Sequence, residues 1–209
     1  DTLSDIARAH HVGYEEIIRA NPGVDPWLPG EGTRVIVPMQ HILPNAPRKG
    51  LVLNLPEMRL YYYPPPQRGK PAEVATFPAS IGRMDWSTPL GLTRVTRKAV
   101  NPVWFPPASV RAEHEAEGDE LPDEVASGPD NPLGEYALYL AVPGYLIHGT
   151  NRPYGIGMRV THGCIRMYPE DIERLFKEVP VGTPVRIVNQ PHKAGWLGGV
   201  LYLETNPLL

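Results

Sequence analysis

Hydrophobic residues alternate with polar ones over short runs along most of the chain, and prolines and glycines separate the runs. Short alternating runs bounded by turn residues are typical of β-strands. The pattern predicts strands at residues 51–55, 59–63, 73–81, 91–100, 136–141, 145–148, 184–188 and 200–204, the first two forming a hairpin. We therefore predict a mainly β fold with a few helices (α+β).

The first 38 residues have a different pattern, with apolar positions three and four residues apart. Two short helices are expected here, one after Thr2, which can cap a helix, and one ending before Asn21. Their apolar positions are Leu3, Ile6 and Ala7 in the first helix and Ile17 and Ile18 in the second. A strand is expected at residues 33–37.

A longer helix is predicted to begin at Pro169. Glu170 and Asp171 follow this proline, and a proline and acids in the first turn suit the free N–H groups and the helix dipole. An apolar stripe then continues to Pro180, and we expect it to face the core. Its members are Ile172, Leu175, Phe176 and Val179.

Residues 110–131 are strongly acidic and contain glycines and prolines. A solvated loop is the simpler interpretation. A mobile flap over an active site is the alternative, because long loops in compact domains are often functional.

Composition narrows the class of protein. The 209 residues hold 20 Lys+Arg and 23 Asp+Glu, a net charge of −3, which argues against an electrostatic nucleic-acid binder. No apolar run has the length of a membrane span. The chain begins at Asp1 within a recognisable motif, so we expect its targeting segment to lie outside this sequence.

The candidate chemistry centres on Cys164, the only cysteine. It follows His162 and Gly163, and His148 precedes all three in the chain. An imidazole can take the proton of a thiol, and backbone N–H groups beside the cysteine can hold an oxyanion, as cysteine acyl transfer requires. A buried structural thiol and a zinc ligand remain open at this point. A single cysteine forms no internal disulfide, which is compatible with an oxidising compartment.

The segment from His148 to Arg166 resembles the signature of the L,D-transpeptidase (YkuD) family, a histidine followed by Ser/Thr-His-Gly-Cys. Further similar segments are Ser80-Ile81-Gly82, Thr88-Pro89-Leu90-Gly91 and residues 102–107 and 128–134. The resemblance covers about residues 50–205 and is strongest to the Gram-negative periplasmic branch. It implies a β-sandwich-like catalytic domain, with a helix after the cysteine, and a location in the periplasm or cell envelope.

Residues 1–38 resemble a LysM module, a βααβ unit that grips the N-acetylglucosamine backbone of glycans. The usual first strand is missing from this sequence. The alternative is a small helical hairpin packed on the enzyme. We expect a module at 1–38, a proline-rich linker at 39–50 and the catalytic domain at 51–209. Since the linker offers little apolar surface for docking, the module is expected to act as a tether.

The resemblance also implies roles for individual residues. Cys164 would be the nucleophile and His148 the proton shuttle, oriented by the backbone carbonyl of Gly149. The N–H groups of Gly163 and Cys164 would hold the oxyanion. The remaining candidates stand near the substrate: His162, which shapes the turn or acts directly, and Thr161, Tyr154 and Arg166. Arg166 either holds a substrate carboxylate or pairs with an acid on the following helix.

A family member would cut the bond between the third, L-configured stem residue and the terminal D-alanine of peptidoglycan. The acyl group would pass to the amine of a second stem (a 3→3 cross-link), to a lysine of an outer-membrane lipoprotein, or to water or a D-amino acid. Stem peptides and glycan strands are thus the expected partners. No cofactor or metal is implied, and carbapenems are expected to acylate Cys164.

Rival classes fit the sequence less well. In NlpC/P60-like peptidases the cysteine precedes the histidine, the reverse of the order here. A zinc hydrolase would need a pattern such as His-Glu-x-x-His. A non-catalytic glycan-binding protein is expected to have lost the cysteine or histidine, yet both are present. An L,D-carboxypeptidase or amidase that hydrolyses the same bond remains an alternative.

Overall fold

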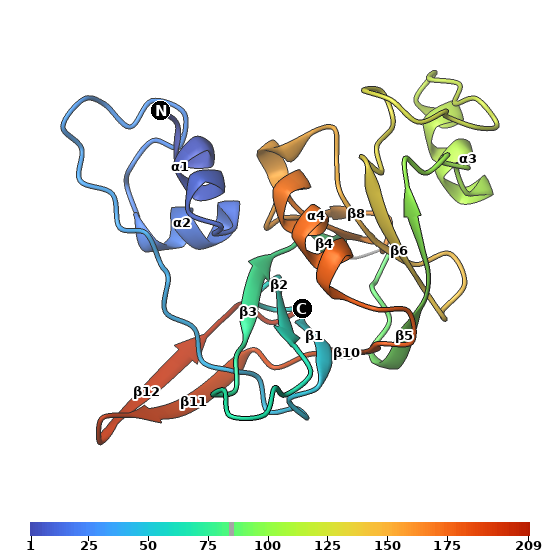
Figure 1. The fold of residues 1–209 in the computed structure, drawn as a ribbon. Helices are drawn as coiled ribbons and strands as arrows, with labels where there is room; N and C mark the ends of the chain where they lie inside the picture. The colour runs from blue at the N-terminus through green and yellow to red at the C-terminus, as the bar shows by residue number, and fades with distance from the viewer. Residues whose placement is uncertain (84–85) are drawn as a thin grey trace.

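The computed structural model describes residues 1–83 and 86–209. Its centre is an eight-stranded, strongly curled sheet with strand order β3-β2-β1-β10-β5-β6-β7-β9 (Figure 1). The strands are β1 (Gly50–Asn54), β2 (Arg59–Tyr63), β3 (Ala75–Pro78), β5 (Gly91–Val100), β6 (Tyr136–Leu140), β7 (Leu146–His148), β9 (Ile165–Arg166) and β10 (Pro184–Val188). The mainly β fold class is confirmed.

Four strands lie outside this sheet. A short parallel pair, β4 (Ile81–Gly82) and β8 (Arg159–Thr161), lies near β9, and a hairpin of β11 (His192–Leu197) and β12 (Val200–Thr205) projects from the body (Figure 1). The helices are α1 (Leu3–Ala9), α2 (Tyr14–Ala20), α3 (Ala108–Ala116), α4 (Pro169–Glu178) and the 3-10 turn η1 (Pro153–Gly155). None of the helices in residues 1–83 and 86–209 has the length and apolar character needed to cross a membrane.

Helix α4 follows the predicted pattern. It has Pro169 and two acids in its first turn, and the apolar stripe at Ile172, Leu175 and Val179 is buried in the main core with the sheet strands. The predicted helix is therefore confirmed, and it packs against β6 of the sheet.

The strand expected at residues 33–37 is not formed. Instead, the side-chain amide of Asn21 takes the place of a neighbouring strand: it donates to the carbonyl of Ile36 at 2.8 Å and accepts from the N–H of Ile36 at 2.7 Å. Val35 and Val37 still pack against the small apolar core of the two helices. The alternating pattern thus predicted the packing of Val35 and Val37 correctly, but no strand among the described residues lies beside this segment.

The acidic region is also not wholly a loop, because its first part forms α3. Alanines and glutamates favour a helix after Pro107, and Val110 supplies one buried anchor. The ion pairs Arg111–Asp123 and His114–Asp119 tie the following residues back to the helix. The sequence interpretation gave weight to charge and overlooked helix propensity.

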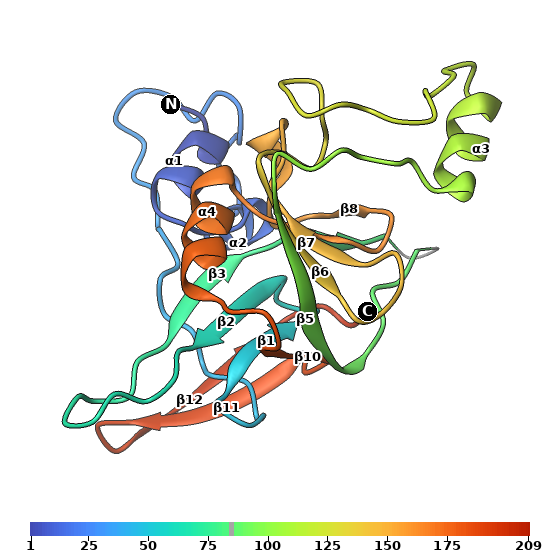
Figure 2. The ribbon, with the colours of Figure 1, turned by 45° about the vertical axis from the view of Figure 1, so that its right-hand side comes forward.

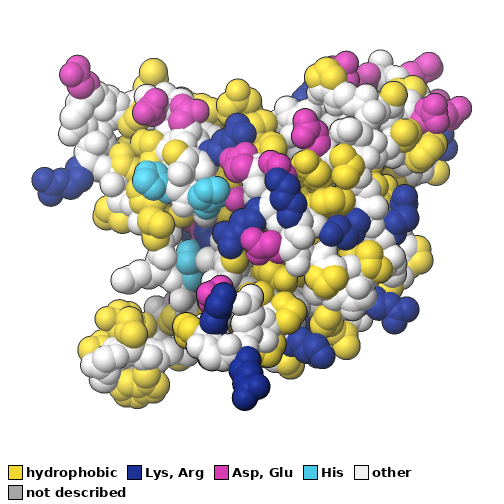
Figure 3. Space-filling model, viewed as in Figure 1, with side chains coloured by type: hydrophobic (Ala, Val, Ile, Leu, Met, Phe, Trp, Pro, Cys, Tyr) yellow, Lys and Arg dark blue, Asp and Glu magenta, His cyan; other side chains and the backbone are white. Residues whose placement is uncertain are grey.

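Residues 1–38 contact the catalytic domain directly. The expectation that the module is joined to this domain only through a flexible linker is therefore not met. Figures 1 and 2 show α1 and α2 beside α4, and Figure 3 shows charged and histidine side chains gathered where they meet. Arg59 of β2, only 1% exposed, pairs with Glu16 of α2 at 2.7 Å. His11 pairs with Asp171 at 2.6 Å, and Arg8 with Glu170 at 2.9 Å. The expectation was wrong because polar residues of the two helices contact β2 and α4 directly, which the composition of the linker does not reveal.

Backbone groups extend the contact to the segment that follows β7. The N–H of Tyr14 donates to the carbonyl of Ile156 at 2.8 Å, and the Ser4 hydroxyl donates to the carbonyl of Tyr154 at 3.3 Å. A Cβ on Gly157 would lie 2.4 Å from the Cα of Gly13, so two glycines allow the backbones to touch. The module therefore supports the loop that leads toward the cysteine.

The Arg59–Glu16 pair gives a stability prediction. Replacing Glu16 with alanine leaves a buried guanidinium without its carboxylate, and we expect the free energy of unfolding to fall by about 3 kcal/mol. Glu15→Ala on the same helix removes only a surface pair with Arg19 and should cost less than about 1 kcal/mol. Urea denaturation of both variants measures the difference, and equal effects would contradict the docking described above.

Candidate active site

Two neighbouring strands bring the chemical groups together. β7 runs parallel to β9, with Ile147 opposite Ile165 and His148 opposite Arg166. Both isoleucines are fully buried in the core. Since side chains alternate along a strand, His148 and Arg166 point to the other face, and Cys164, two residues before Arg166, lies on that face too. The register thus places Cys164 and His148 as diagonal neighbours.

The imidazole of His148 is held in one tautomer. Its Nδ1 lies 2.7 Å from the carbonyl oxygen of Gly149, and because a carbonyl only accepts, Nδ1 carries the proton. Burial lowers the pKa of His148 to about 4, against the opposing effect of the Gly149 carbonyl. A Cβ on Gly149 would lie 3.2 Å from Ile172, so a glycine suits this position. His148 is therefore neutral near pH 7, with its proton on Nδ1 and the lone pair on Nε2.

The thiol of Cys164 is neutral as well. Burial raises its pKa, and a backbone hydrogen bond from Leu146 opposes this only in part. Sγ lies 3.5 Å from the carbonyl oxygen of Gly144. In the described part of the chain no hydrogen bond joins Cys164 to His148. The resting site thus combines a neutral thiol with a neutral imidazole.

The turn before the cysteine depends on Gly163 and Thr161. Gly163 has φ +99°, and a Cβ there would lie 2.8 Å from the ring of Tyr145. The Thr161 hydroxyl donates to the carbonyl of Cys164 at 2.6 Å and accepts from the N–H of Gly163 at 3.2 Å. The N–H of Gly163 already has an acceptor in this conformation, whereas that of Cys164 has none within residues 1–83 and 86–209. Of the two N–H groups, that of Cys164 is therefore the one available to a further acceptor.

Arg166 has no acidic partner among the described residues. The acids of α4 are already paired: Glu170 with Arg8, Asp171 with His11, Glu173 with Lys177 and Glu178 with Arg174. Burial and, secondarily, Arg152 lower the pKa of Arg166, and its Nε is buried without a hydrogen bond. The expected alternative of a salt bridge to the following helix is not realised, so the guanidinium can receive a substrate carboxylate.

His162 makes different contacts from His148. Its Nε2 lies 2.7 Å from Glu113 Oε2 of α3, and Trp86 stands edge-on to its ring with centroids 5.2 Å apart. Tyr154 lies on η1 and is 66% exposed. Neither residue contacts His148 in the described structure, although the sequence placed all of them in one site.

Ser80 connects the site to its surroundings and was given no role from the sequence. Its backbone exchanges hydrogen bonds with Arg166 at 2.7 and 3.0 Å, and its hydroxyl bridges the carbonyl of Gly155 and the N–H of Gly157. The resemblance of residues 80–82 to the family was the signal available in the sequence. It did not predict the hydrogen bonds of Ser80, because a serine at the end of a strand has many possible partners. Glu113 was missed because its helix was expected to be a loop.

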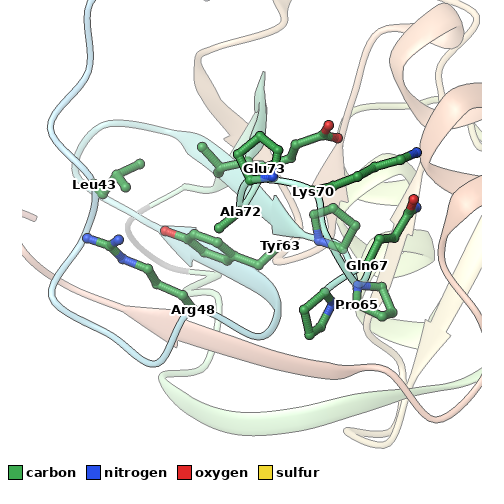
Figure 4. Close-up of a pocket in the computed structure, with 12 residues that line it drawn as sticks. Leu43, Arg48, Tyr63, Pro65, Gln67, Lys70, Ala72 and Glu73 are labelled. Atoms are coloured by element: carbon green, nitrogen blue, oxygen red, sulfur yellow. The ribbon is translucent and has the colours of Figure 1, made fainter.

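A cavity and a cluster of titratable side chains lie away from Cys164 and His148. A cavity of about 330 Å³ lies beside β2, where Tyr63 and Arg48 line it (Figure 4), at the opposite end of the strand order from β7 and β9. Among the described residues, His41, Glu57 and Glu204 approach closely enough to hold a metal. The ammonium group of Lys193 already binds both carboxylates, at 2.6 and 3.0 Å, so this cluster is a buried ion-pair network.

Comparison with known proteins identifies the family of this chain. A family model described as the L,D-transpeptidase catalytic domain (YkuD) matches residues 48–187, and a LysM domain model matches residues 1–38. The chain therefore belongs to the L,D-transpeptidase (YkuD) family.

Named relatives support this assignment. The chain is 48% identical over 196 residues to the probable L,D-transpeptidase YcfS of Escherichia coli K12, covering 92% of this chain and 60% of that protein. It is 46% identical over 209 residues to the probable L,D-transpeptidase YbiS of the same strain, covering 99% and 67%. This chain thus spans only about two thirds of their length. A solved structure, the Ldtfm–avibactam carbamoyl enzyme, shares the fold with 22% identity and a TM-score of 0.51, covering 69% of this chain and 50% of that one.

The state of His148 gives a pH prediction. A base with a lowered pKa is protonated only in more acidic solution, so it stays active as the pH falls toward that value. We expect the acid limb of kcat/KM to lie near pH 4, well below the ordinary value for histidine. A pH profile of Cys164 acylation measures this limb, and a midpoint near 6.5 would contradict the geometry.

Proposed function

We propose that this protein is a peptidoglycan L,D-transpeptidase that acts through an acyl-enzyme on Cys164. The observation that supports this most is the pairing of β7 with β9, which sets His148 beside the cysteine while Gly149 holds its tautomer. Family membership defines a transferase-type enzyme, and the assignment of the steps below is part of the proposal.

In the first half-reaction, Nε2 of His148 takes the proton of the Cys164 thiol as Sγ attacks the carbonyl carbon of the L-centre. The oxyanion forms against the N–H of Cys164. The C–N bond to D-alanine then breaks, His148 returns the proton to the leaving amine, and a thioester remains. A neutral imidazole is the correct starting state for this transfer.

Arg166 supplies recognition in the same proposal. Its unpaired guanidinium lies on the face that carries Cys164 and His148, and stem peptides carry carboxylates that a guanidinium binds well. Arg152 adds positive charge close by. Tyr154, exposed on the loop between β7 and β8, would line the groove.

In the second half-reaction, the acyl group passes to an amine of a neighbouring stem or of a lipoprotein lysine. Hydrolysis of the same thioester would make the protein an L,D-carboxypeptidase. The docked LysM module supports a substrate joined to glycan strands, and with the family it supports a location in the cell envelope.

Product analysis tests the proposal. Incubation with a disaccharide-tetrapeptide and an amine acceptor should release D-alanine and give a cross-linked product, both detected by mass spectrometry. Cys164→Ala should abolish both products, and His148→Ala should lower the rate about a hundredfold or more. Full activity in His148→Ala with loss in His162→Ala would overturn the assignment of the base.

A further inference from the structure

The second histidine beside the nucleophile has a partner that the mechanism above leaves unused. His162 stands two residues before Cys164, and its Nε2 lies 2.7 Å from the carboxylate of Glu113. The other carboxylate oxygen of Glu113 binds the guanidinium of Arg83. Three segments distant in the sequence therefore meet at His162, whose ring is partly exposed.

The chemistry of the contact defines the tautomer. Hydrogen bonds to Arg83 and, next, to His162 hold the pKa of Glu113 below its usual range, so the group is a carboxylate near pH 7. A carboxylate only accepts hydrogen bonds, so Nε2 of His162 carries a proton. Nδ1 has no hydrogen-bond partner among the described residues and is left as the proton-accepting nitrogen.

The arrangement parallels that of His148. In both rings one nitrogen donates to a fixed oxygen, Gly149 O for His148 and Glu113 Oε2 for His162. An imidazole oriented by a third group is the usual form of a general base. The two rings differ in the group that holds them: the partner of His148 is a neutral carbonyl, whereas that of His162 is the carboxylate of Glu113.

Acyl transfer to an amine requires a group that removes a proton from the incoming nitrogen. The acceptor arrives near neutral pH as an ammonium ion, which has no lone pair for attack. His148 lies buried with its pKa lowered to about 4, so it is poorly suited to remove this first proton. His162 is partly exposed, on the chain segment that carries the thioester.

We propose, resting on the function above, that His162 is the proton acceptor for the incoming amine and that Glu113 is its positioning residue. Nδ1 of His162 takes one proton from the ammonium. The free amine attacks the thioester carbonyl, a C–N bond forms and the C–S bond breaks. The second proton of the nitrogen passes through His148 to the departing sulfur, and His162 releases its own proton to solvent.

The experiment separates the two half-reactions in Glu113→Gln. Acylation is followed by intact mass with the tetrapeptide donor alone, and transfer is followed after adding glycine, whose amine is charged near pH 7. We expect acylation within about twofold of wild type and transfer reduced about tenfold or more. Transfer should recover at higher pH, and with hydroxylamine, which is already neutral. Arg83 is the charged group that contacts this pair within the described residues.

Two further variants complete the test. Glu115→Gln makes the same charge change at an exposed position of α3 and should leave both steps unchanged. His162→Gln should also keep acylation and lose transfer. The transfer rate of the double variant should be no lower than that of His162→Gln. The histidine variant keeps the test valid if Glu113→Gln disturbs α3. Equal loss of acylation and transfer, an equal loss with hydroxylamine, or unchanged transfer would each overturn the proposal. Absence of any acyl-enzyme in the wild-type protein would refute the proposed function instead.

Discussion

The parallel pairing of β7 with β9 is the constraint on which the site depends. The strands belong to opposite ends of a long loop, and their register alone determines that His148 and Cys164 share a face. The fully buried Ile147 and Ile165 lock this register, because a slip by one residue would exchange the core and site faces. The backbone bonds between Ser80 and Arg166 hold the outer side of β9 in place.

Burial then sets the electrostatics of the pair. The same packing that fixes the strands raises the pKa of Cys164 and lowers that of His148, so both groups are uncharged at rest. A neutral pair avoids the cost of holding two charges in a buried site. Two oxygen atoms supply the hydrogen bonds that this buried site requires. The Gly149 carbonyl accepts from the imidazole of His148, and the Thr161 hydroxyl donates to the carbonyl of Cys164 in the turn.

The docked module extends this network beyond the catalytic sheet. Contacts from α1 and α2 support the backbone at residues 154–157, the Ser80 hydroxyl binds Gly155 and Gly157, and its backbone pairs with Arg166. A continuous chain of hydrogen bonds therefore leads from the LysM module to the strand that follows the cysteine. The module serves as a structural part of the enzyme, whatever its affinity for glycan.

The sequence was most informative where local pattern and chemistry agree. Alternation and turn residues located most of the sheet strands, and the proline and acids before Ile172 located α4. The strand predicted at residues 33–37 is absent because an alternating pattern indicates burial but does not supply a neighbouring strand. The side chain of Asn21 makes the hydrogen bonds that such a strand would make. The contacts of Arg59 with Glu16 and of His162 with Glu113 join distant segments through polar groups, which leave no periodic signal in the sequence.

Nitrogen-15 NMR of histidine-labelled protein tests the central claim, a neutral thiol–imidazole pair, most directly. The account predicts that His148 at pH 7 is the neutral tautomer with the proton on Nδ1, and that it becomes doubly protonated only near pH 4. Substituting Cys164 with alanine should leave this state unchanged. A doubly protonated His148 at pH 7 that becomes neutral in the Cys164→Ala protein would reveal a resting thiolate–imidazolium pair and contradict the account.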